Sequence, residues 1–270
     1  MKKFSSLLHN LILTPSRNTK IKLLQDYFKI LDINRAYALA ILSDQLSFQF
    51  IKASKLRELV YEQVDQHLFD YSYDYVGDLA ETISLIWPTN KEGKSQNLST
   101  LIENIKKIKK SEINTEFSKV LSELSNNERW TLIKICTGGL RIGVSERLVK
   151  TALADLYNKS VNEIEEIWHG LEFPYENLFQ WLKNETSKPK IDFKKLFHPM
   201  MLANPIDEEK DFKRLDANEF QAEYKWDGIR VQLMVSSNSV SLYSRTGDNI
   251  SSAFPEIIET TKGDAVIDGE

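Results

Sequence analysis

The chain has 270 residues, of which 41% are hydrophobic and 27% are charged, with a formal net charge of −4. This length suits two domains with ordinary cores, and the slight negative charge means that any nucleic-acid-binding surface must gather its cations locally. The single cysteine, Cys136, excludes an internal disulfide and suits a reducing cytoplasm, and no stretch is long and apolar enough to span a bilayer.

The first two thirds of the chain follow helical periodicity. Near the N-terminus, a predicted amphipathic helix places four apolar side chains on one face: Phe4, Leu7, Leu8 and Leu11. Polar residues interrupt this apolar run and no small-residue cleavage site follows, so we interpret it as a helix rather than a signal peptide. Strand patterns are nearly absent before residue 184, which predicts an all-helical N-terminal domain.

Apolar stripes and capping residues mark further helices in this half. The stripe of one predicted helix, which stops at the proline that follows, consists of Val76, Leu79, Ala80, Ile83 and Ile86. Capping boxes are expected where Thr100 precedes Glu103 and where Ser160 precedes Glu163, and the second of these helices should end at Gly170.

A glycine-rich turn links two of the predicted helices. The first helix should end near Cys136, and Ser145 is a suitable N-cap for the second, because an apolar stripe follows it: Leu148, Val149, Ala152, Leu153 and Leu156. The turn itself contains Gly138, Gly139, Arg141 and Gly143. Local features leave two interpretations open: a tight turn with an exposed arginine, or a phosphate-binding turn built from backbone N–H groups, a helix N-terminus and the arginine.

The pattern changes after a polar, proline-containing segment at residues 184–199, which we interpret as a linker. We place the domain boundary at residue 190, so that the domains are residues 1–190 and 191–270. Period-2 patterns then predict strands at residues 230–235, 239–244 and 264–270, with a short helix opened by Pro255. The fold class is therefore a multidomain α+β protein: an all-α domain, followed by a domain rich in antiparallel strands.

The segment EYKWDGIR places a lysine between two carboxylates and next to a glycine. In a strand, Glu223, Lys225 and Asp227 would share one face, and the Asp-Gly step predicts a tight hairpin turn directly after Lys225. Beyond Gly228, the predicted apolar face consists of Ile229, Val231, Leu233 and Val235.

Lys225 has three interpretations. It could belong to an exposed charged face stabilised by ion pairs, it could bind a phosphate, or it could be a covalent nucleophile. The sequence contains neither GxxxxGK[ST] nor GxGxxG, which argues against the P-loop and Rossmann forms of phosphate binding.

Read as a whole, EYKWDGIR resembles motif I of the covalent nucleotidyltransferases, which include ATP-dependent DNA ligases, RNA ligases and mRNA capping enzymes. Two further segments, SRTGDNIS at residues 244–251 and AVIDGE at residues 265–270, resemble later motifs of these enzymes in the same order. In the helical half, GGLRIGVSE is similar to the DNA-contacting turn of ATP-dependent DNA ligases with an N-terminal DNA-binding domain, and GDLAETI and HPMMLANPI are similar to bacterial members. The resemblance thus extends over nearly the whole chain and favours DNA ligases over RNA ligases and capping enzymes, which lack such a domain.

The resemblance implies a role for each motif residue. Lys225 would be the catalytic nucleophile that carries AMP, with Asp227 and Gly228 as supporting residues. Residues implied to contact ATP are Glu223, which would accept from the adenine amino group, and Arg230, Arg245 and Glu270, with Glu270 also a metal contact. Residues implied to contact nicked duplex DNA are Gly138, Gly139, Arg141, Gly143 and Ser145.

If Lys225 is the nucleophile that carries AMP, nearby cations must favour the neutral form of its amine. A lysine amine in water has a pKa of about 10.4, and neighbouring carboxylates favour its protonated, non-nucleophilic form. The resemblance therefore implies that Arg230, Arg245 and a divalent ion such as Mg²⁺ act beside the triphosphate. We expect adenylylation to require that ion.

The resemblance also sets expectations for the chain as a whole. We expect it to be the N-terminal part of a monomeric, cytoplasmic, nucleoid-associated DNA ligase that forms little or no enzyme–AMP without the later motifs. Two alternatives remain: a non-enzymatic DNA-binding protein with a degenerate second domain, and a nucleotidyltransferase of the RNA ligase or capping type.

Overall fold

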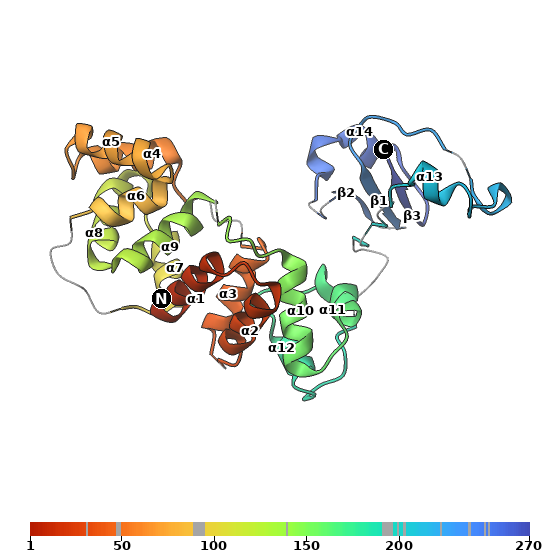
Figure 1. Ribbon diagram of the computed structural model, residues 1–270, viewed down its shortest axis with the longest axis horizontal. Coiled ribbons are helices and arrows are strands. Elements are labelled where there is room, and N and C mark those ends of the chain that lie inside the picture. The colour runs from red at the N-terminus through yellow and green to blue at the C-terminus, as the bar shows by residue number, and fades with distance from the viewer. Residues whose placement is uncertain are drawn as a thin grey trace. The chain divides into compact units, whose positions relative to one another are not determined.

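The computed structural model describes residues 1–30, 32–46, 50–88, 95–138, 140–190, 197–198, 200–201, 204–221, 223–236, 239–245, 247 and 249–270. These residues form two compact units (Figure 1). Unit 1 comprises Met1–Val161 with Glu172–Thr186, and unit 2 comprises Asn162–Leu171 with Ser187–Glu270. The boundary placed at residue 190 from the sequence stays a prediction. Within the described ranges, no helix is both long and apolar enough to cross a bilayer.

Unit 1 is built from helices. They are α1 (Lys2–Leu13), α2 (Arg17–Phe28), α3 (Asn34–Leu42), α4 (Ala53–Tyr61), α5 (Gln66–Val76), α6 (Leu79–Ile86), α7 (Leu98–Lys106), the 3₁₀ turn η1 (Lys110–Glu112), α8 (Ile113–Glu123), α9 (Asn126–Thr137), α10 (Glu146–Tyr157) and α12 (Glu176–Leu182). Helix α11 (Val161–Trp168) begins where the first segment of unit 1 ends.

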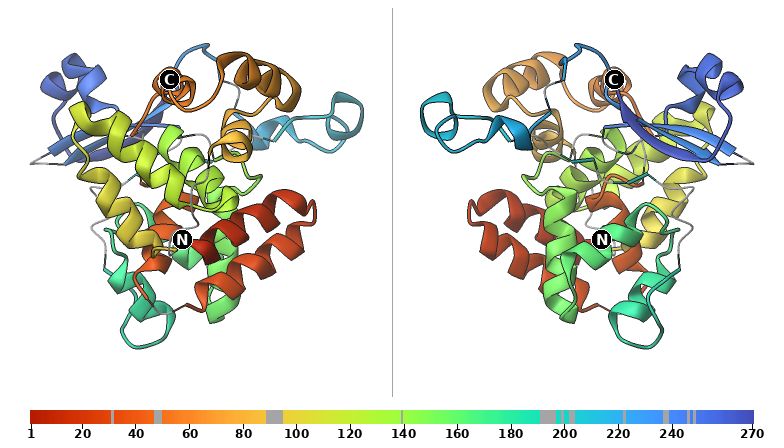
Figure 2. Two further views of the ribbon diagram at one scale, coloured as in Figure 1. Left: turned by 90° about the vertical axis from the view of Figure 1, so that its left-hand side faces the viewer. Right: turned by 90° about the vertical axis from the view of Figure 1, so that its right-hand side faces the viewer.

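Apolar faces hold these helices together, as the sequence patterns predicted. The first helix is confirmed, since α1 buries Phe4, Leu7, Leu8 and Leu11. Figures 1 and 2 show α2 beside both α1 and α10, and these pairs are in contact. The buried side of α10 includes Leu148, Val149, Ala152 and Leu153, four of the five residues in the predicted stripe; the fifth, Leu156, is half-buried.

Two helix boundaries predicted in unit 1 are wrong. The helix predicted to start at Val76 is two helices, because Gly77 ends α5 in the left-handed region (φ 74°) and the Asp78 side chain caps α6. The capping box of Thr100 and Glu103 does not form, since α7 begins at Leu98 and both residues lie inside it. Glu103 instead accepts a hydrogen bond from the Tyr37 hydroxyl at 2.8 Å.

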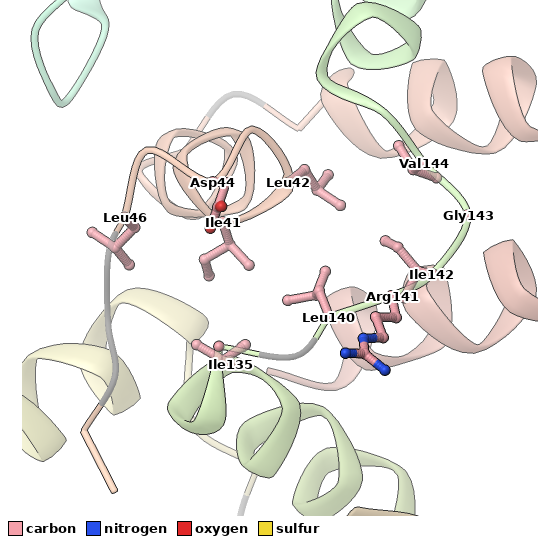
Figure 3. A pocket seen from close by; sticks show the side chains of 11 residues that line it. Ile41, Leu42, Asp44, Leu46, Ile135, Leu140, Arg141, Ile142, Gly143 and Val144 are labelled. Atoms are coloured by element: carbon pink, nitrogen blue, oxygen red, sulfur yellow. The ribbon is translucent and has the colours of Figure 1, made fainter. Parts of the chain in front are cut away.

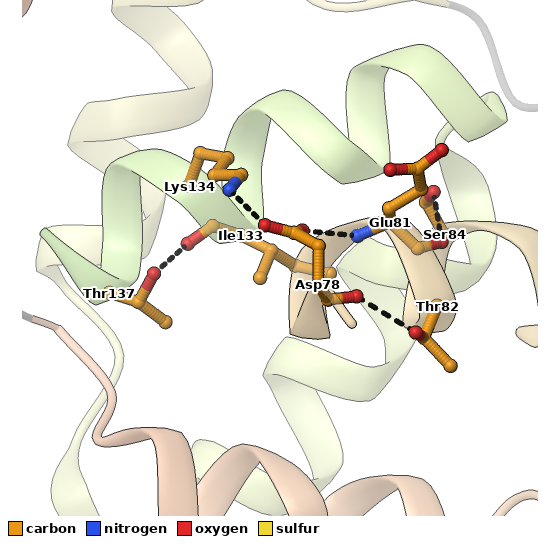
Figure 4. A network of polar contacts seen from close by, with 7 residues as sticks. All are labelled: Asp78, Glu81, Thr82, Ser84, Ile133, Lys134 and Thr137. Carbon is orange, nitrogen blue, oxygen red and sulfur yellow. Dashed lines mark hydrogen bonds and ion pairs between the residues drawn. The ribbon is translucent and has the colours of Figure 1, made fainter. Parts of the chain in front are cut away.

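Polar contacts tie α6 to α9 (Figure 4). The Asp78 carboxylate accepts from the backbone N–H of Glu81 at 2.9 Å, as an N-cap does, and pairs with the Lys134 ammonium at 2.5 Å. Burial raises the pKa of Asp78, but the Lys134 contact and the backbone N–H outweigh it, so the net pKa lies below its ordinary value.

Arg129 of α9 is fully buried and is held by backbone carbonyls. Its Nε donates to the carbonyl of Leu121 at 2.8 Å, and its Nη1 and Nη2 donate to those of Ser84 and Leu124, each at 2.9 Å. Burial lowers the pKa of Arg129 to about 10. This arginine therefore joins α9 to α6 and to the end of α8 from inside the unit.

Unit 2 contains a three-stranded antiparallel sheet in the order β2-β1-β3. The strands are β1 (Val231–Ser236), β2 (Ser239–Ser244) and β3 (Ala265–Gly269). The helical elements of this segment are α13 (Glu208–Asp211), the 3₁₀ turns η3 (Ala217–Glu219) and η4 (Ser251–Ala253), and α14 (Pro255–Thr260). All three predicted strands and the helix that starts at Pro255 are confirmed, and α14 lies beside β2 (Figure 2). Helix α11 begins directly after Ser160 and ends at Trp168, two residues before Gly170.

The predicted inward face of β1 is only partly right. Gln232, expected to point outward, is buried, and the apolar residues Val231 and Leu233 are only half-buried. The Gln232 amide donates to the His198 carbonyl at 3.0 Å and accepts from the His198 N–H at 2.6 Å. A side-chain amide thus pairs with a backbone peptide, which satisfies both polar groups and attaches the chain near residue 198 to the sheet.

Candidate functional site

Strand register brings three of the four predicted nucleotide-contacting residues to one end of the sheet. Val231, the first residue of β1, pairs with Ser244 at the end of β2 and with Gly269 at the end of β3. The residues just outside these positions are Arg230, Arg245 and Glu270. Three segments that are separate in sequence therefore meet at the same sheet end.

A backbone hydrogen bond joins the lysine-bearing segment to the end of β3. The Gly228 N–H donates to Oε1 of Glu270 at 3.0 Å. A Cβ added at Gly228 would lie 3.2 Å from Cγ of Glu270, so the glycine allows the two segments to approach closely. Glu270 thus holds motif I through one carboxylate oxygen.

A second contact joins the same two segments. Arg230 donates from Nε to Oδ1 of Asp268 at 3.2 Å and from Nη2 to Oδ2 at 2.6 Å, a bidentate pair. The Asp268 hydrogen bond raises the pKa of Arg230. Asp268 was not among the predicted site residues, and only the pairing of β1 with β3 would have identified it. Because Asp268 already neutralises Arg230, this arginine is not a free cation for the lysine.

Lys225 lies outside the sheet, and the hairpin predicted around Gly228 is wrong. Residues 223–230 form no strand, with a bend at Gly228, and β1 begins only at Val231. Glu223, Lys225 and Asp227 are all exposed, and none of them forms a hydrogen bond or an ion pair with another described residue. The structure therefore leaves the amine open to a small molecule and does not fix the two neighbouring carboxylates against it.

The turn after β2 carries Arg245 and is anchored by a glycine. Gly247 has φ 91°, and a Cβ there would lie 2.9 Å from Cε1 of His169 and 2.9 Å from Cδ1 of Phe197. The rings of His169 and Phe197 pack edge to face, with centroids 4.8 Å apart. Arg245 itself is exposed, while its neighbours Thr246 and Asp248 lie outside the described residues.

In unit 1, the predicted turn adopts a backbone that glycine permits. Gly138 (φ 72°), Arg141 (φ 38°) and Gly143 (φ 64°) all have left-handed φ angles, and Gly139 lies outside the described residues. The Ser145 hydroxyl accepts from the Leu148 N–H at 3.3 Å, which confirms the predicted N-cap of α10. Ile142 is buried, so the turn is anchored by its side chain while Arg141 is exposed.

Two hollows adjoin this turn. A pocket of about 410 Å³ lies between the turn and the end of α3, and its walls include Ile41, Leu42 and Asp44. Figure 3 shows the Arg141 guanidinium pointing away from Ile41 and Leu42. A second hollow of about 490 Å³ is lined by Arg17 and Lys20 of α2 and by residues 143–145.

Three cationic side chains line these two hollows beside the turn: Arg17, Lys20 and Arg141. This arrangement meets the requirement that an acidic chain must gather its positive charge locally to bind a polyanion.

No cluster of three or more metal-ligating side chains occurs among the described residues. Asp268 and Glu270 lie at this sheet end. Asp268 is paired with Arg230 through both oxygens, and Glu270 accepts from the Gly228 N–H through one oxygen. Mg²⁺ needs only one or two protein carboxylates when substrate phosphates supply the remaining ligands, so Glu270 fits an ion that enters with a nucleotide.

Sequence comparison identifies the two halves independently. A family model described as "DNA ligase N terminus" matches residues 1–154, and one described as "ATP dependent DNA ligase domain" matches residues 200–270. The chain belongs to the ATP-dependent DNA ligase family. Both the turn of unit 1 and the sheet end of unit 2 fall within these matches.

Individual DNA ligases match between about half and three quarters of the chain. A DNA ligase of Nitrosopumilus maritimus is 37% identical over 147 residues, 53% of this chain and 25% of that protein. A probable DNA ligase of Koribacter versatilis is 32% identical over 163 residues, 56% of this chain and 26% of that protein. A DNA ligase of Thermococcus onnurineus is 24% identical over 226 residues, 77% of this chain and 40% of that protein. The chain thus spans between a quarter and two fifths of the length of these relatives.

Proposed function

We propose that this chain is the N-terminal part of an ATP-dependent DNA ligase that seals nicks between a 5′-phosphate and a 3′-hydroxyl. The observation that carries the proposal is the sheet end of unit 2, where register brings Arg230, Arg245 and Glu270 together. The lysine segment is attached there by the contacts of Gly228 and Arg230 with β3. In this account Lys225 is the nucleophile.

The proposed reaction has three balanced steps. The Lys225 amine attacks the α-phosphorus of ATP, so that a P–N bond forms, pyrophosphate leaves and the amine proton passes to solvent. An oxygen of the 5′-phosphate then attacks the same phosphorus, the P–N bond breaks, and the lysine amine leaves after taking up a proton from solvent. Finally the 3′-hydroxyl attacks the 5′-phosphorus, loses its proton, and AMP leaves.

Residues of the chain position these groups. Glu223 accepts from the adenine amino group, which favours ATP over GTP because guanine has a carbonyl at that place. Arg245, exposed at the sheet end, contacts ribose or phosphate. Asp227 orients the segment next to Gly228. The Glu270 oxygen that does not accept from Gly228 remains for the ribose or a metal ion.

Glu270 is the residue that would hold Mg²⁺, through the oxygen that does not accept from the Gly228 N–H, and the ion would offset the negative charge of the triphosphate. Arg230 takes a different role from the one that the motif implies. Because it is bound bidentately by Asp268, it fixes the lysine segment to β3. The charge that favours a neutral lysine amine must then come from Arg245 and the ion.

The helical unit supplies the DNA contacts in this proposal. Backbone N–H groups and Arg141 of the turn at residues 138–145 contact the sugar-phosphate backbone of nicked duplex DNA. A cytoplasmic, nucleoid-associated location and a monomeric state complete the proposal.

The experiment that tests the function is nick sealing by the protein expressed from its full reading frame. We expect ATP and Mg²⁺ to support sealing of a 5′-phosphorylated nick, and Lys225→Arg to abolish it. Binding of the same Lys225→Arg protein to nicked duplex should be unchanged. Sealing by Lys225→Arg at the wild-type rate would contradict the proposal, and preference for an RNA nick in direct competition would favour the RNA ligase alternative.

A further inference from the structure

Lys20 binds the backbone of the turn that carries Arg141. Its ammonium donates to the Gly143 carbonyl at 2.9 Å and to the Ile142 carbonyl at 3.3 Å. Gly143 lets the ammonium come this close, since a Cβ there would lie 2.7 Å from Nζ. A residue in the first turns of α2 therefore holds a turn that lies far along the sequence.

The two carbonyls explain how the turn keeps its shape. Left-handed φ angles at Arg141 and Gly143 change the chain direction twice within three residues. A non-glycine residue in that region is strained unless its surroundings hold it there. Ile142, buried between them, anchors the turn by its side chain, and Lys20 anchors it by its carbonyls.

Lys20 has no other partner to satisfy its charge within the described part of the chain. Its side chain is half-buried, and it forms no ion pair with a described carboxylate. The next lysine of α2, Lys22, is exposed and forms no hydrogen bond with the described residues of the turn. The two lysines therefore carry the same charge on the same helix, but only Lys20 donates hydrogen bonds to the carbonyls of the turn.

We infer that Lys20 is a positioning residue for DNA binding: it holds the carbonyls of Ile142 and Gly143 so that Arg141 is presented to the duplex. The inference rests on the proposed role of the turn at residues 138–145. It differs from a direct phosphate contact, because Lys20 then acts through Arg141 and adds nothing once Arg141 is gone.

A double-mutant cycle on the 270-residue chain tests this coupling. The probe is a fluorescent, 5′-phosphorylated nicked duplex, and the readout is Kd at fixed salt. We expect Arg141→Ala and Lys20→Met each to weaken binding several-fold, by roughly 3–10-fold, or about 1 kcal/mol. In the Arg141→Ala background, Lys20→Met should change Kd less than about twofold.

Two further variants separate position from charge. Lys22→Met removes the same charge from the same helix and should change Kd less than Lys20→Met does. Lys20→Arg keeps a long cationic donor and should bind more tightly than Lys20→Met. Hydrogen exchange should become faster for amides 140–143 in Lys20→Met and stay unchanged in the helices of unit 1, which excludes general unfolding.

The possible failures are distinguishable. If Arg141→Ala leaves Kd unchanged, the proposed role of the turn is wrong. If Arg141→Ala weakens binding but Lys20→Met has the same effect in both backgrounds, Lys20 contacts phosphate directly and this inference is overturned. Unchanged exchange at residues 140–143 in Lys20→Met would also overturn it.

Discussion

At Gly247, the backbone conformation and the neighbouring aromatic rings both disfavour a side chain. Its φ of 91° suits glycine, and the rings of His169 and Phe197 fill the position of a Cβ. The turn that presents Arg245 is thereby pressed against an aromatic pair. The sequence alone does not show that aromatic rings require a glycine here, because His169 and Phe197 lie far from Gly247 along the chain.

We predict that Gly247→Ala destabilises unit 2 by more than about 1 kcal/mol, because strain and steric overlap act together. Native-state hydrogen exchange of the β1 and β2 amides measures unit 2 by itself. Gly263→Ala is the matched control: it has φ 131° with no atom within 4 Å of a Cβ, so it carries strain without overlap. Equal losses of protection in the two variants would show that the aromatic contact is unimportant.

The contacts around Lys225 were not predictable from the sequence. The resemblance to motif I selected Lys225 and Gly228, and the order of the later motifs selected Arg245 and Glu270; their roles stay predictions. What the sequence could not reveal is that Asp268 binds Arg230 and that Glu270 binds the Gly228 N–H. Both contacts depend on the register of β3 against β1, which neither strand encodes alone.

Among the elements of unit 1, α9 depends on one buried arginine. Arg129 satisfies carbonyls of Leu121, Ser84 and Leu124, so its loss leaves buried acceptors without a donor. We predict that Arg129→Met lowers the free energy of unfolding by about 3 kcal/mol, despite similar volume. Urea unfolding followed by far-UV circular dichroism measures it, with the exposed Arg17→Met as control. A loss no larger than that of the control would contradict this role.

The start of α6 should make stability depend on pH. The pKa of Asp78 is lowered in the folded state from an ordinary value of 3.8. The carboxylate therefore stabilises the fold fully above that value, and this stabilisation is lost as pH falls through the lower folded pKa. Asp78→Asn keeps a capping oxygen but removes the charge that Lys134 pairs with.

We predict that Asp78→Asn is less stable than the wild type at pH 7, by up to about 1 kcal/mol because the pair is partly exposed. The difference should shrink below pH 3.8 and disappear in more acidic solution. Urea midpoints measured across this range decide the matter. A difference that stays constant with pH would show that the Asp78 charge contributes nothing.

Helices and strands were predicted correctly where a single sequence pattern dominated. Apolar stripes identified α1 and α10, and period-2 patterns identified the three strands. The errors arose where two signals competed. Gly77 interrupted a stripe that continued through it, and the alternation around Lys225 matched a strand but no partner strand pairs with it among the described residues.

At the scale of the whole molecule, two units divide the proposed work. Unit 1 places Arg17 and Arg141 beside one turn whose carbonyls Lys20 holds, and unit 2 brings Arg230, Arg245 and Glu270 to one sheet end. In the proposed function, a chain with a net charge of −4 binds DNA through cations that are gathered locally. The helical half and the strand-rich half were both predictable from periodicity, because burial on one face imposes the period.

The most direct test of this account locates the nucleotide. The protein expressed from its full reading frame is incubated with ATP and Mg²⁺, digested, and its peptides are sequenced by mass spectrometry under conditions that preserve a P–N bond. We predict one added AMP, on Lys225, which excess chelator prevents and which DNA with a 5′-phosphorylated nick removes. AMP on any other side chain, or none in a protein that seals nicks, would contradict the central claim.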